Sequence, residues 1–401
     1  MCGVAPFPGD ISRFANKAVA FRFKGQALTF RLSHALFSSF DIDAGSRLLL
    51  KSIAGQVDFA VLRSALDIGC GVGVIGACVA SQAPEARVMM QDRDALAAAF
   101  ARENCRENGL EQVSVSCSLA FRGLGEEAFD LVTSNLPAKA GKPVLRMLLH
   151  RAAGCLTPRG VAAVVIVLPL AAFARESLAA IGCEIVHHEE SNGYAVLHYR
   201  AGAAARETVS QREDISPYIR SASRFDAEGF AYSLQTAHSL PDFDVIGYAV
   251  ELALGLARET SVSGRLLAWN PGQGHVPVAL LSRDAQRISS IDIASRDLLQ
   301  CTIAALNVSS MGKTPHSIQA LCSEADLGSA FPDGSFDMVI AEPNPIPRVP
   351  WQPGLARVSA GLLKPGGALL VVCTSTEIRR FLDQDHGFQL AGSGKHAGFR
   401  R

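Results

Sequence analysis

The chain has 401 residues, of which 48% are hydrophobic, so it is too long for one ordinary domain and can bury a core in each of two. Its 38 basic and 38 acidic residues give a formal net charge of zero, which excludes a generally basic nucleic-acid-binding protein but leaves a local basic face possible. Its 10 cysteines include no Cys-x-x-Cys pair, and we find no signal-peptide pattern or bilayer-length apolar run, so we expect no metal site, reduced thiols and a cytoplasmic location.

The most informative segment joins a predicted strand to a predicted helix. The strand covers residues 61–68 and carries an acid near its end, Asp67. Three glycines follow at alternate positions, and the apolar residues 74–80 can begin a helix. Glycine permits the backbone angles of a tight turn and a close approach of ligand to backbone, while the helix start offers unpaired N–H groups. This pattern predicts a ligand-binding turn.

The spacing of this turn is Asp-x-Gly-x-Gly-x-Gly, which differs from the dinucleotide-binding pattern. An acid two residues before the first glycine suits a ligand with a cationic amine, such as S-adenosylmethionine (SAM). A purely structural turn of another α/β protein is the alternative. The predicted cofactor-binding residues of the turn are Asp67, Gly69, Cys70, Gly71 and Gly73.

The next two predicted strands end in polar residues at the same edge of a parallel sheet. Asp92 closes residues 88–92, where a carboxylate can accept both ribose hydroxyls of an adenosine, and Arg93 follows it. Ser118 follows residues 113–117, where a polar group can contact the adenine. The alternatives are a solvated loop acid for Asp92 and an ordinary turn serine for Ser118.

A fourth strand, residues 129–133, leads to the sequence Ser-Asn-Leu-Pro-Ala. The side-chain oxygen of Asn135 and the carbonyl of Leu136 can be aimed at one point, with Pro137 fixing the turn. Two acceptors suit an exocyclic or amide –NH₂ group, because they orient its lone pair and stabilise the positive charge that develops during methyl transfer. We therefore predict Asn135, Leu136 and Pro137 as catalytic residues, with Asn135 also among the cofactor-binding residues and a plain turn as the alternative.

The second half repeats the plan of the first at an offset of about 200 residues. The segments that correspond, in the same order, are 66–73 and 267–274, 88–92 and 288–292, 129–135 and 336–342, and 156–160 and 363–367. The second copy lacks the acid, with Ala268 in its place, and has Asn270-Pro271 where the first has Gly-Cys. Four matches in order, with similar lead-in segments, predict a duplicated domain whose second copy is degenerate.

Both halves alternate apolar strands with amphipathic helices, which predicts an α/β fold of two tandem Rossmann-like domains with mostly parallel sheets flanked by helices. We expect a catalytic domain over residues 1–200, a linker over 201–226 and the degenerate domain over 227–401.

These residues resemble the class I SAM-dependent methyltransferases, and more narrowly the methyltransferase small domain of the rRNA guanine-N2 methyltransferase family. The resemblance covers about residues 20–200. Its further motifs are Phe37-Ser38, residues 43–49, Asn104 with 108–110, residues 140–142 and residues 193–197. There are two departures: Ala138 replaces the aromatic residue of the family's Asn-Pro-Pro-aromatic tetrapeptide, and Ser118 replaces an acid.

The resemblance implies a SAM-dependent N-methyltransferase acting on RNA, with guanine N2 of rRNA as the first choice. A protein amide or a small amine is the second choice. The residues alone do not choose between these substrates, because the net charge is zero and no basic tract is visible in the sequence. A catalytically silent scaffold that binds RNA or ribosomal protein is the alternative from another class of function.

Overall fold

The computed structural model describes residues 3–4, 11–202, 204–205, 213–384 and 386–394. The chain forms two compact units, one of residues 10–218 and one that combines residues 1–9 with 219–401. No helix of the described residues is long and apolar enough to cross a bilayer.

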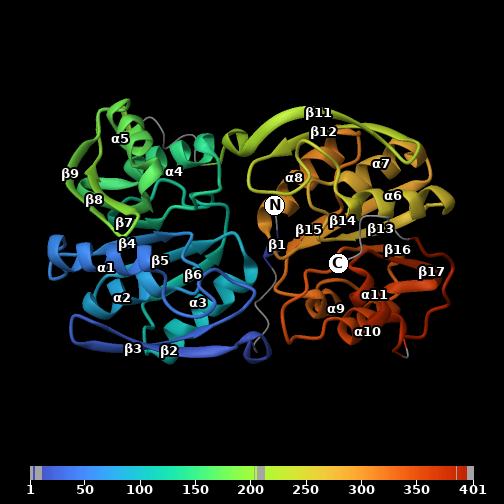
Figure 1. The fold of residues 1–401 in the computed structure, drawn as a ribbon, viewed down its shortest axis with the longest axis horizontal. Helices are drawn as coiled ribbons and strands as arrows, with labels where there is room; N and C mark the ends of the chain where they lie inside the picture. Colours follow the sequence, from blue (N-terminus) through green and yellow to red (C-terminus); the bar gives the residue numbers. More distant parts are fainter. Residues whose placement is uncertain (1–2, 5–10, 203, 206–212, 385, 395–401) are drawn as a thin grey trace. The chain divides into compact units, whose positions relative to one another are not determined.

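The first unit is a seven-stranded sheet flanked by helices (Figure 1), in the strand order β6-β5-β4-β7-β8-β10-β9. Its strands are β4 (Ser64–Ile68), β5 (Arg87–Asp92), β6 (Val113–Cys117), β7 (Phe129–Asn135), β8 (Leu156–Val167), β9 (Glu184–Ser191) and β10 (Tyr194–Arg200), preceded by the hairpin β2 (Lys17–Phe23) and β3 (Gln26–Leu32). Its helices are α1 (Ala44–Gln56), α2 (Val74–Gln82), α3 (Ala95–Glu107), α4 (Lys142–Gly154) and α5 (Ala171–Ala179).

The first five strands of this sheet are parallel, and β10 runs antiparallel to both β8 and β9. The chain runs outward from β4 to β5 and β6, then returns to the other side of β4 with β7 and β8. The strand order therefore reverses at β4. In open α/β sheets, ligands bind at such a switch point, outside the carboxyl ends of the strands.

The hairpin β2–β3 packs on α2 and α3, and hydrogen bonds from the side chain of Asn104 in α3 hold it in place. The fully buried Asn104 amide accepts from the Arg31 backbone N–H (2.8 Å) and donates to the carbonyls of Arg31 (3.2 Å) and Val72 (2.9 Å). Because Val72 belongs to the glycine-rich turn, one buried side chain fixes both the hairpin and the turn.

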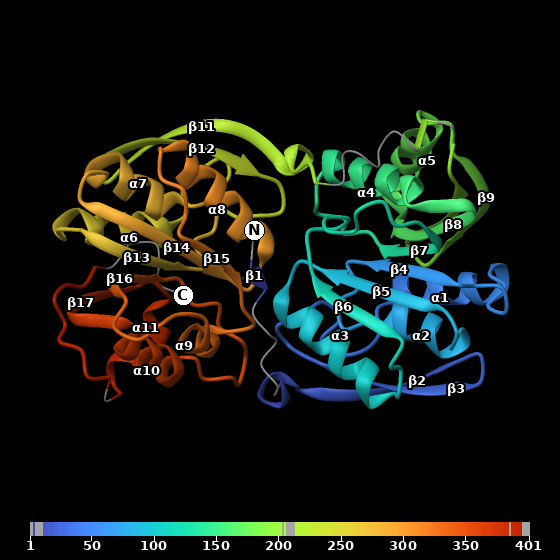
Figure 2. The ribbon, with the colours of Figure 1, turned by 180° about the vertical axis from the view of Figure 1, so that it is seen from behind.

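The second unit has a six-stranded sheet, in the order β1-β15-β14-β13-β16-β17, in which every pairing is parallel (Figure 2). Its strands are β1 (Gly3–Val4), β13 (Gly264–Trp269), β14 (Ile288–Ser295), β15 (Ser317–Ala320), β16 (Phe336–Ala341) and β17 (Leu363–Val371), with a hairpin of β11 (Ile219–Ala227) and β12 (Phe230–Ala237). Its helices are α6 (Tyr248–Glu259), α7 (His275–Asp284), α8 (Leu298–Ser310), α9 (Leu327–Ala330), α10 (Gln352–Leu362) and α11 (Ser375–Leu382).

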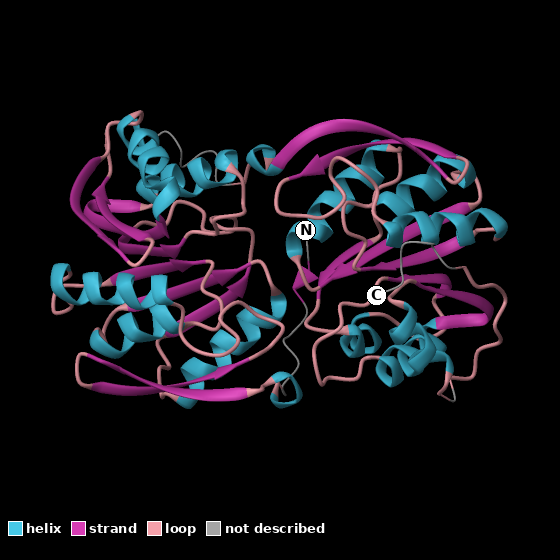
Figure 3. Ribbon diagram, viewed as in Figure 1, coloured by secondary structure: helices cyan, strands magenta, loops and turns pink. Residues whose placement is uncertain are grey.

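The side chain of Asn307 in α8 holds the hairpin β11–β12 by hydrogen bonds, as Asn104 holds the hairpin β2–β3. It accepts from the Gln235 N–H (2.8 Å) and donates to the carbonyls of Gln235 (2.9 Å) and Gln273 (2.8 Å), and Gln273 lies in the turn after β13. Both units therefore consist of a mostly parallel sheet between helices and a hairpin that is hydrogen-bonded to a buried asparagine (Figure 3). The predicted α/β Rossmann-like fold class is confirmed.

The structure differs from expectation at the join and at the first residues of the chain. Residues 203 and 206–212 of the expected linker lie outside the described residues. Residues from Ile219 onward form strand β11, because their side chains alternate between covered and exposed positions against β12. The two-residue strand β1 pairs with β15, so the beginning of the chain belongs to the second unit.

Candidate active site

The glycine-rich turn joins β4 to α2 at the switch point of the first sheet. Gly69, Gly71 and Gly73 all have positive φ values, of 68°, 56° and 89°. A Cβ atom at Gly69 or Gly71 would meet no atom within 4 Å, whereas one at Gly73 would lie 3.0 Å from the side chain of Ala101. The first two glycines therefore leave an open cradle along the backbone, and the third permits close packing of α2 on α3.

Asp67 lies beneath this turn rather than on its surface. Its side chain is buried and accepts hydrogen bonds from the Gly76 N–H of α2 (3.0 Å) and from the Thr133 hydroxyl of β7 (2.9 Å). Burial raises the pKa of the carboxyl to about 7. Each oxygen is bonded to one protein donor, so Asp67 holds α2 and β7 in position under the turn, and its contact with a ligand amine stays a prediction.

Asp92 lies at the end of β5 and is only partly exposed. One carboxylate oxygen accepts from the Gly71 N–H (2.8 Å) and the other from the Asp94 N–H (2.9 Å). Burial raises the pKa of this carboxyl to about 6, against the opposing effect of its hydrogen bond with the Asp94 backbone. Asp92 thus also fixes the conformation of the glycine turn.

Ser118 and Arg93 lie at the same edge of the sheet. The Ser118 N–H donates to the Asp92 carbonyl (2.8 Å), and the Ser118 hydroxyl donates to the carbonyl of Arg122 (2.8 Å). Because the hydroxyl hydrogen is already used, the Ser118 oxygen can act only as an acceptor toward a ligand, which suits an amino group. The Arg93 carbonyl accepts a hydrogen bond from the Cys117 thiol. The nearby Cys70 thiol is buried, and burial raises its pKa well above the usual value.

Asn135 is the last residue of β7, and its side-chain amide is fixed in one orientation. The Nδ2 atom donates to Asp43 Oδ2 (2.9 Å) and to Ser46 Oγ (3.0 Å), both at the start of α1. No donor among the described residues reaches Asn135 Oδ1. The fixed amide therefore presents its oxygen, the atom that an acceptor role requires.

The residues that hold Asn135 were not predicted as site residues. Asp43 is the N-cap of α1, where it accepts the Ser46 N–H (3.2 Å), and it also accepts the Tyr194 hydroxyl of β10 (3.4 Å). A Cβ at Gly45 would lie 2.9 Å from the Tyr194 ring, so only glycine lets that ring lie so close to the helix start. The Asp-x-x-Ser spacing is a capping signal visible in the sequence. Its link to a residue 92 positions away is visible only in the fold.

The loop after Asn135 keeps the predicted turn. The Leu136 N–H donates to the Val165 carbonyl of β8 (2.9 Å), and the Ala140 N–H donates to the Pro137 carbonyl (3.0 Å). Leu136 is buried, whereas Pro137 and Ala138 are exposed. The fold thus brings the turn, Asp92, Ser118 and Asn135 to one edge of the sheet, at the ends of four successive strands.

The corresponding turn of the second unit has the same backbone but is filled. Asn270, Gly272 and Gly274 have φ values of 53°, 56° and 90°, close to those of the first turn. Asn270 is buried, donates to the Glu342 carbonyl (3.0 Å) and accepts from the Ser295 hydroxyl (2.9 Å). A side chain therefore occupies the space that is open above Gly69 in the first unit.

The predicted match of Asp92 with Asp292 is wrong by three residues. Asp94 and Asp297 are the N-caps of α3 and α8 and occupy equivalent positions. The Asp94 N–H donates to the side chain of Asp92, and the Asp297 N–H donates to the side chain of Ser295. The residue equivalent to Asp92 is therefore Ser295. Asp292 lies instead inside β14, fully buried, where it forms an ion pair with Arg265 (2.7 Å). Among the described residues of the second unit, Ser295 therefore stands where the first unit has the carboxylate of Asp92.

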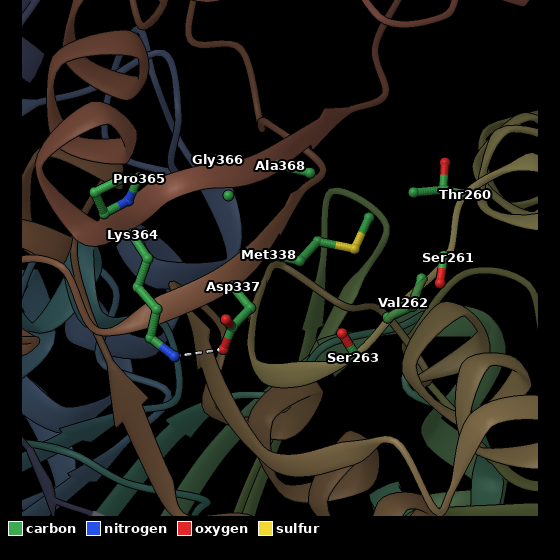
Figure 4. Close-up of a pocket in the computed structure, with 11 residues that line it drawn as sticks. Thr260, Ser261, Val262, Ser263, Asp337, Met338, Lys364, Pro365, Gly366 and Ala368 are labelled. Carbon is green, nitrogen blue, oxygen red and sulfur yellow. Dashed lines mark hydrogen bonds and ion pairs between the residues drawn. The ribbon is translucent and has the colours of Figure 1, made fainter.

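The second unit also has a polar cavity at the opposite edge of its sheet, beside the starts of β13 and β16 (Figure 4). Its one lysine, Lys364, bonds to Asp337 at 2.7 Å, and Asp337 also accepts the Arg265 N–H. The charges of this cavity are satisfied within the protein, and it lies away from the strand ends that form the candidate site.

Comparison with known proteins agrees with this geometry. The methyltransferase small domain matches residues 27–198. The uncharacterized protein YbxB of Bacillus subtilis is 31% identical over 142 residues, which are 35% of this chain and 69% of that protein. The ribosomal RNA small subunit methyltransferase C of Haemophilus influenzae is 40% identical over 106 residues, which span 26% of this chain and only 30% of that relative.

A solved structure resembles most of the chain. The T. thermophilus 16S rRNA N2 methyltransferase RsmC, in complex with AdoMet and guanosine, superposes with a TM-score of 0.62, covering 91% of this chain and 92% of the other at 20% identity. This likeness shows a shared fold. With the family match over the first unit and the similarity to YbxB, it leads to one conclusion: the chain belongs to the methyltransferase small domain family.

Proposed function

We propose that the chain is a SAM-dependent methyltransferase whose site lies in the first unit and whose target is the exocyclic N2 amine of a guanine in rRNA. The observation that carries this proposal is the fixed amide of Asn135, which presents an acceptor oxygen beside the glycine turn. The names of the relatives support an rRNA substrate, and the AdoMet and guanosine of the similar structure support the cofactor and the base.

The first unit fits SAM at three points. The open cradle above Gly69 and Gly71 would take the amino-acid part of the cofactor along the backbone. Asp92 would accept the ribose hydroxyls, and the Ser118 oxygen would accept the adenine amino group. Bound SAM would supply an electrophilic methyl group on a positively charged sulfur.

The residues of this chain would then orient the target amine. Asn135 Oδ1 and the Leu136 carbonyl would each accept one N–H of the –NH₂ group, leaving the nitrogen lone pair directed at the methyl group. As the new N–C bond forms, positive charge develops on nitrogen, and the two oxygens stabilise it. Positioning would therefore supply most of the rate. The methyl–sulfur bond would break as the N–C bond forms, S-adenosylhomocysteine would leave, and the proton lost by the nitrogen would pass to solvent water.

The second unit would support the first without binding cofactor. Asn270 fills the cradle, and Ser295 replaces the ribose carboxylate. We propose that this unit is a structural or substrate-binding platform. The competing function, a catalytically silent scaffold that docks on RNA or ribosomal protein, predicts that SAM is bound without transfer of its methyl group.

Calorimetry on the intact protein tests the cofactor part of the proposal. One SAM per chain is expected, with affinity lost in Asp92→Ala and retained in Ser295→Ala, the matched change in the second unit. Two SAM molecules per chain, or equal losses in both variants, would contradict it. Incubation with labelled SAM and deproteinised rRNA then separates the enzyme from the scaffold, because only the enzyme transfers label.

A further inference from the structure

Three basic residues follow the Asn-Leu-Pro turn within eleven positions: Lys139, Lys142 and Arg146. All three are exposed. Among the described residues, no carboxylate lies within ion-pair distance of any of them. By contrast, several other exposed cations of the same unit are paired, such as Arg87 with Glu127 at 2.7 Å. The chain has no net charge, so this group is a local excess of positive charge rather than part of a basic surface.

Two of these cations are held against one aromatic ring. The Lys142 ammonium and the Arg146 guanidinium each lie 5.4 Å from the centre of the Phe173 ring, within the range of cation–π attraction. Phe173 belongs to α5, which begins just after β8 ends. Their side chains therefore converge on one partly buried ring instead of spreading into solvent.

This group lies at the same edge of the sheet as the candidate catalytic residue. Asn135 is paired with Val165 in the neighbouring strand β8, and β8 ends two residues later. The segment that carries Phe173 thus leaves the sheet beside Asn135, while α4, which carries both cations, begins seven residues after it.

Helix stability alone does not favour this arrangement. Lys142 and Arg146 are four residues apart on α4, where like charges repel by a few tenths of a kcal/mol. Lys142 is also the first residue of the helix, and the first turn contains no acidic residue, although acids are favoured there by the helix dipole. A negatively charged ligand would offset both the repulsion between Lys142 and Arg146 and the unfavourable interaction of Lys142 with the helix dipole.

We infer that Lys142 and Arg146, held side by side on Phe173, bind the phosphate backbone of the RNA strand next to the target base. The inference rests on the proposed function, and it distinguishes an RNA substrate from a small amine or a protein amide, which carry no such row of phosphates. Guanidinium binds phosphate oxygens through two N–H groups and ammonium binds as a point charge. The ring restricts both side chains before RNA arrives, which lowers the entropy lost on binding.

The test is the salt dependence of RNA binding. Fluorescence anisotropy with a short single-stranded RNA that contains guanine, at several salt concentrations, is measured for the wild type and for Lys142→Gln/Arg146→Gln. Each phosphate contact to single-stranded RNA contributes about 0.7 to the slope of log affinity against log salt, so loss of two contacts should lower that slope by about 1.4. Affinity at low salt should fall at least about tenfold.

The matched control is Arg22→Gln/Arg159→Gln, which removes the same charge from the exposed hairpin strand β2 and from the start of β8, at the far edge of the sheet. It should keep the wild-type slope, and SAM affinity should be unchanged in both double variants. An unchanged slope in Lys142→Gln/Arg146→Gln, or an equal loss in the control, overturns the inference. If the wild type itself binds no RNA, the proposed RNA substrate is wrong.

Discussion

Replacing Asp43 by alanine tests whether the orientation of Asn135 matters for catalysis. Asp43 Oδ2 accepts from both Asn135 Nδ2 (2.9 Å) and the Ser46 N–H (3.2 Å). Loss of the helix cap costs about 1 kcal/mol, and loss of a partly exposed charge-assisted hydrogen bond costs a similar amount, so unfolding free energy should fall by about 2 kcal/mol. The freed amide can also turn its –NH₂ toward the target amine, which should lower turnover by about tenfold or more.

The control is Asp43→Asn. Its carbonyl oxygen can take the place of Oδ2 and accept from the same two donors, so stability and turnover should stay near the wild-type values. Urea unfolding measures stability, calorimetry measures SAM affinity, and methyl transfer to deproteinised rRNA measures turnover. Asp43→Ala with unchanged turnover on a confirmed substrate would refute the role of the Asp43–Asn135 hydrogen bond.

Three other variants probe the same site. Asn135→Ala should lower turnover by about 10²-fold with little change in SAM affinity, because the acceptor acts mainly in the transition state; comparable losses in both quantities would contradict this. Asp92→Ala should weaken SAM binding by about 1.5–3 kcal/mol and also lower the melting temperature, since the Gly71 N–H loses its acceptor; an unchanged affinity would remove Asp92 from the site. The pKa of Asp67 is about 7 in the folded state and 3.8 in the unfolded state, so the folded state binds the proton more tightly. The unfolding free energy of the wild type should therefore fall as pH rises from about 4 to about 7. Urea unfolding of Asp67→Asn should show a smaller fall over the same range.

Local patterns predicted the backbone of the site well. The glycine spacing determined a turn with three positive φ values, because only the residues near it decide its shape. The strand ends at Asp92 and Asn135 followed from hydrophobic runs that stop at polar residues. Rossmann-like topology then placed those ends at one edge of the sheet.

Side-chain partners far apart in the chain could not be predicted in the same way. No local pattern shows that the Thr133 hydroxyl of a neighbouring strand and the Gly76 N–H bind Asp67 beneath the turn. Asp292 was matched to Asp92 by its resemblance in sequence, whereas the correspondence in the fold is set by the helix cap at Asp297. Packing against other elements decides both kinds of feature, and a short stretch of sequence does not contain it.

The most direct test of the account is the identity of the methylated nucleotide. Deproteinised rRNA is incubated with the intact protein and labelled SAM, digested to nucleosides and resolved by mass spectrometry. The account predicts label in N2-methylguanosine, lost in Asn135→Ala. Label in a ring nitrogen or a ribose, or SAM binding with no transfer to rRNA, would contradict it.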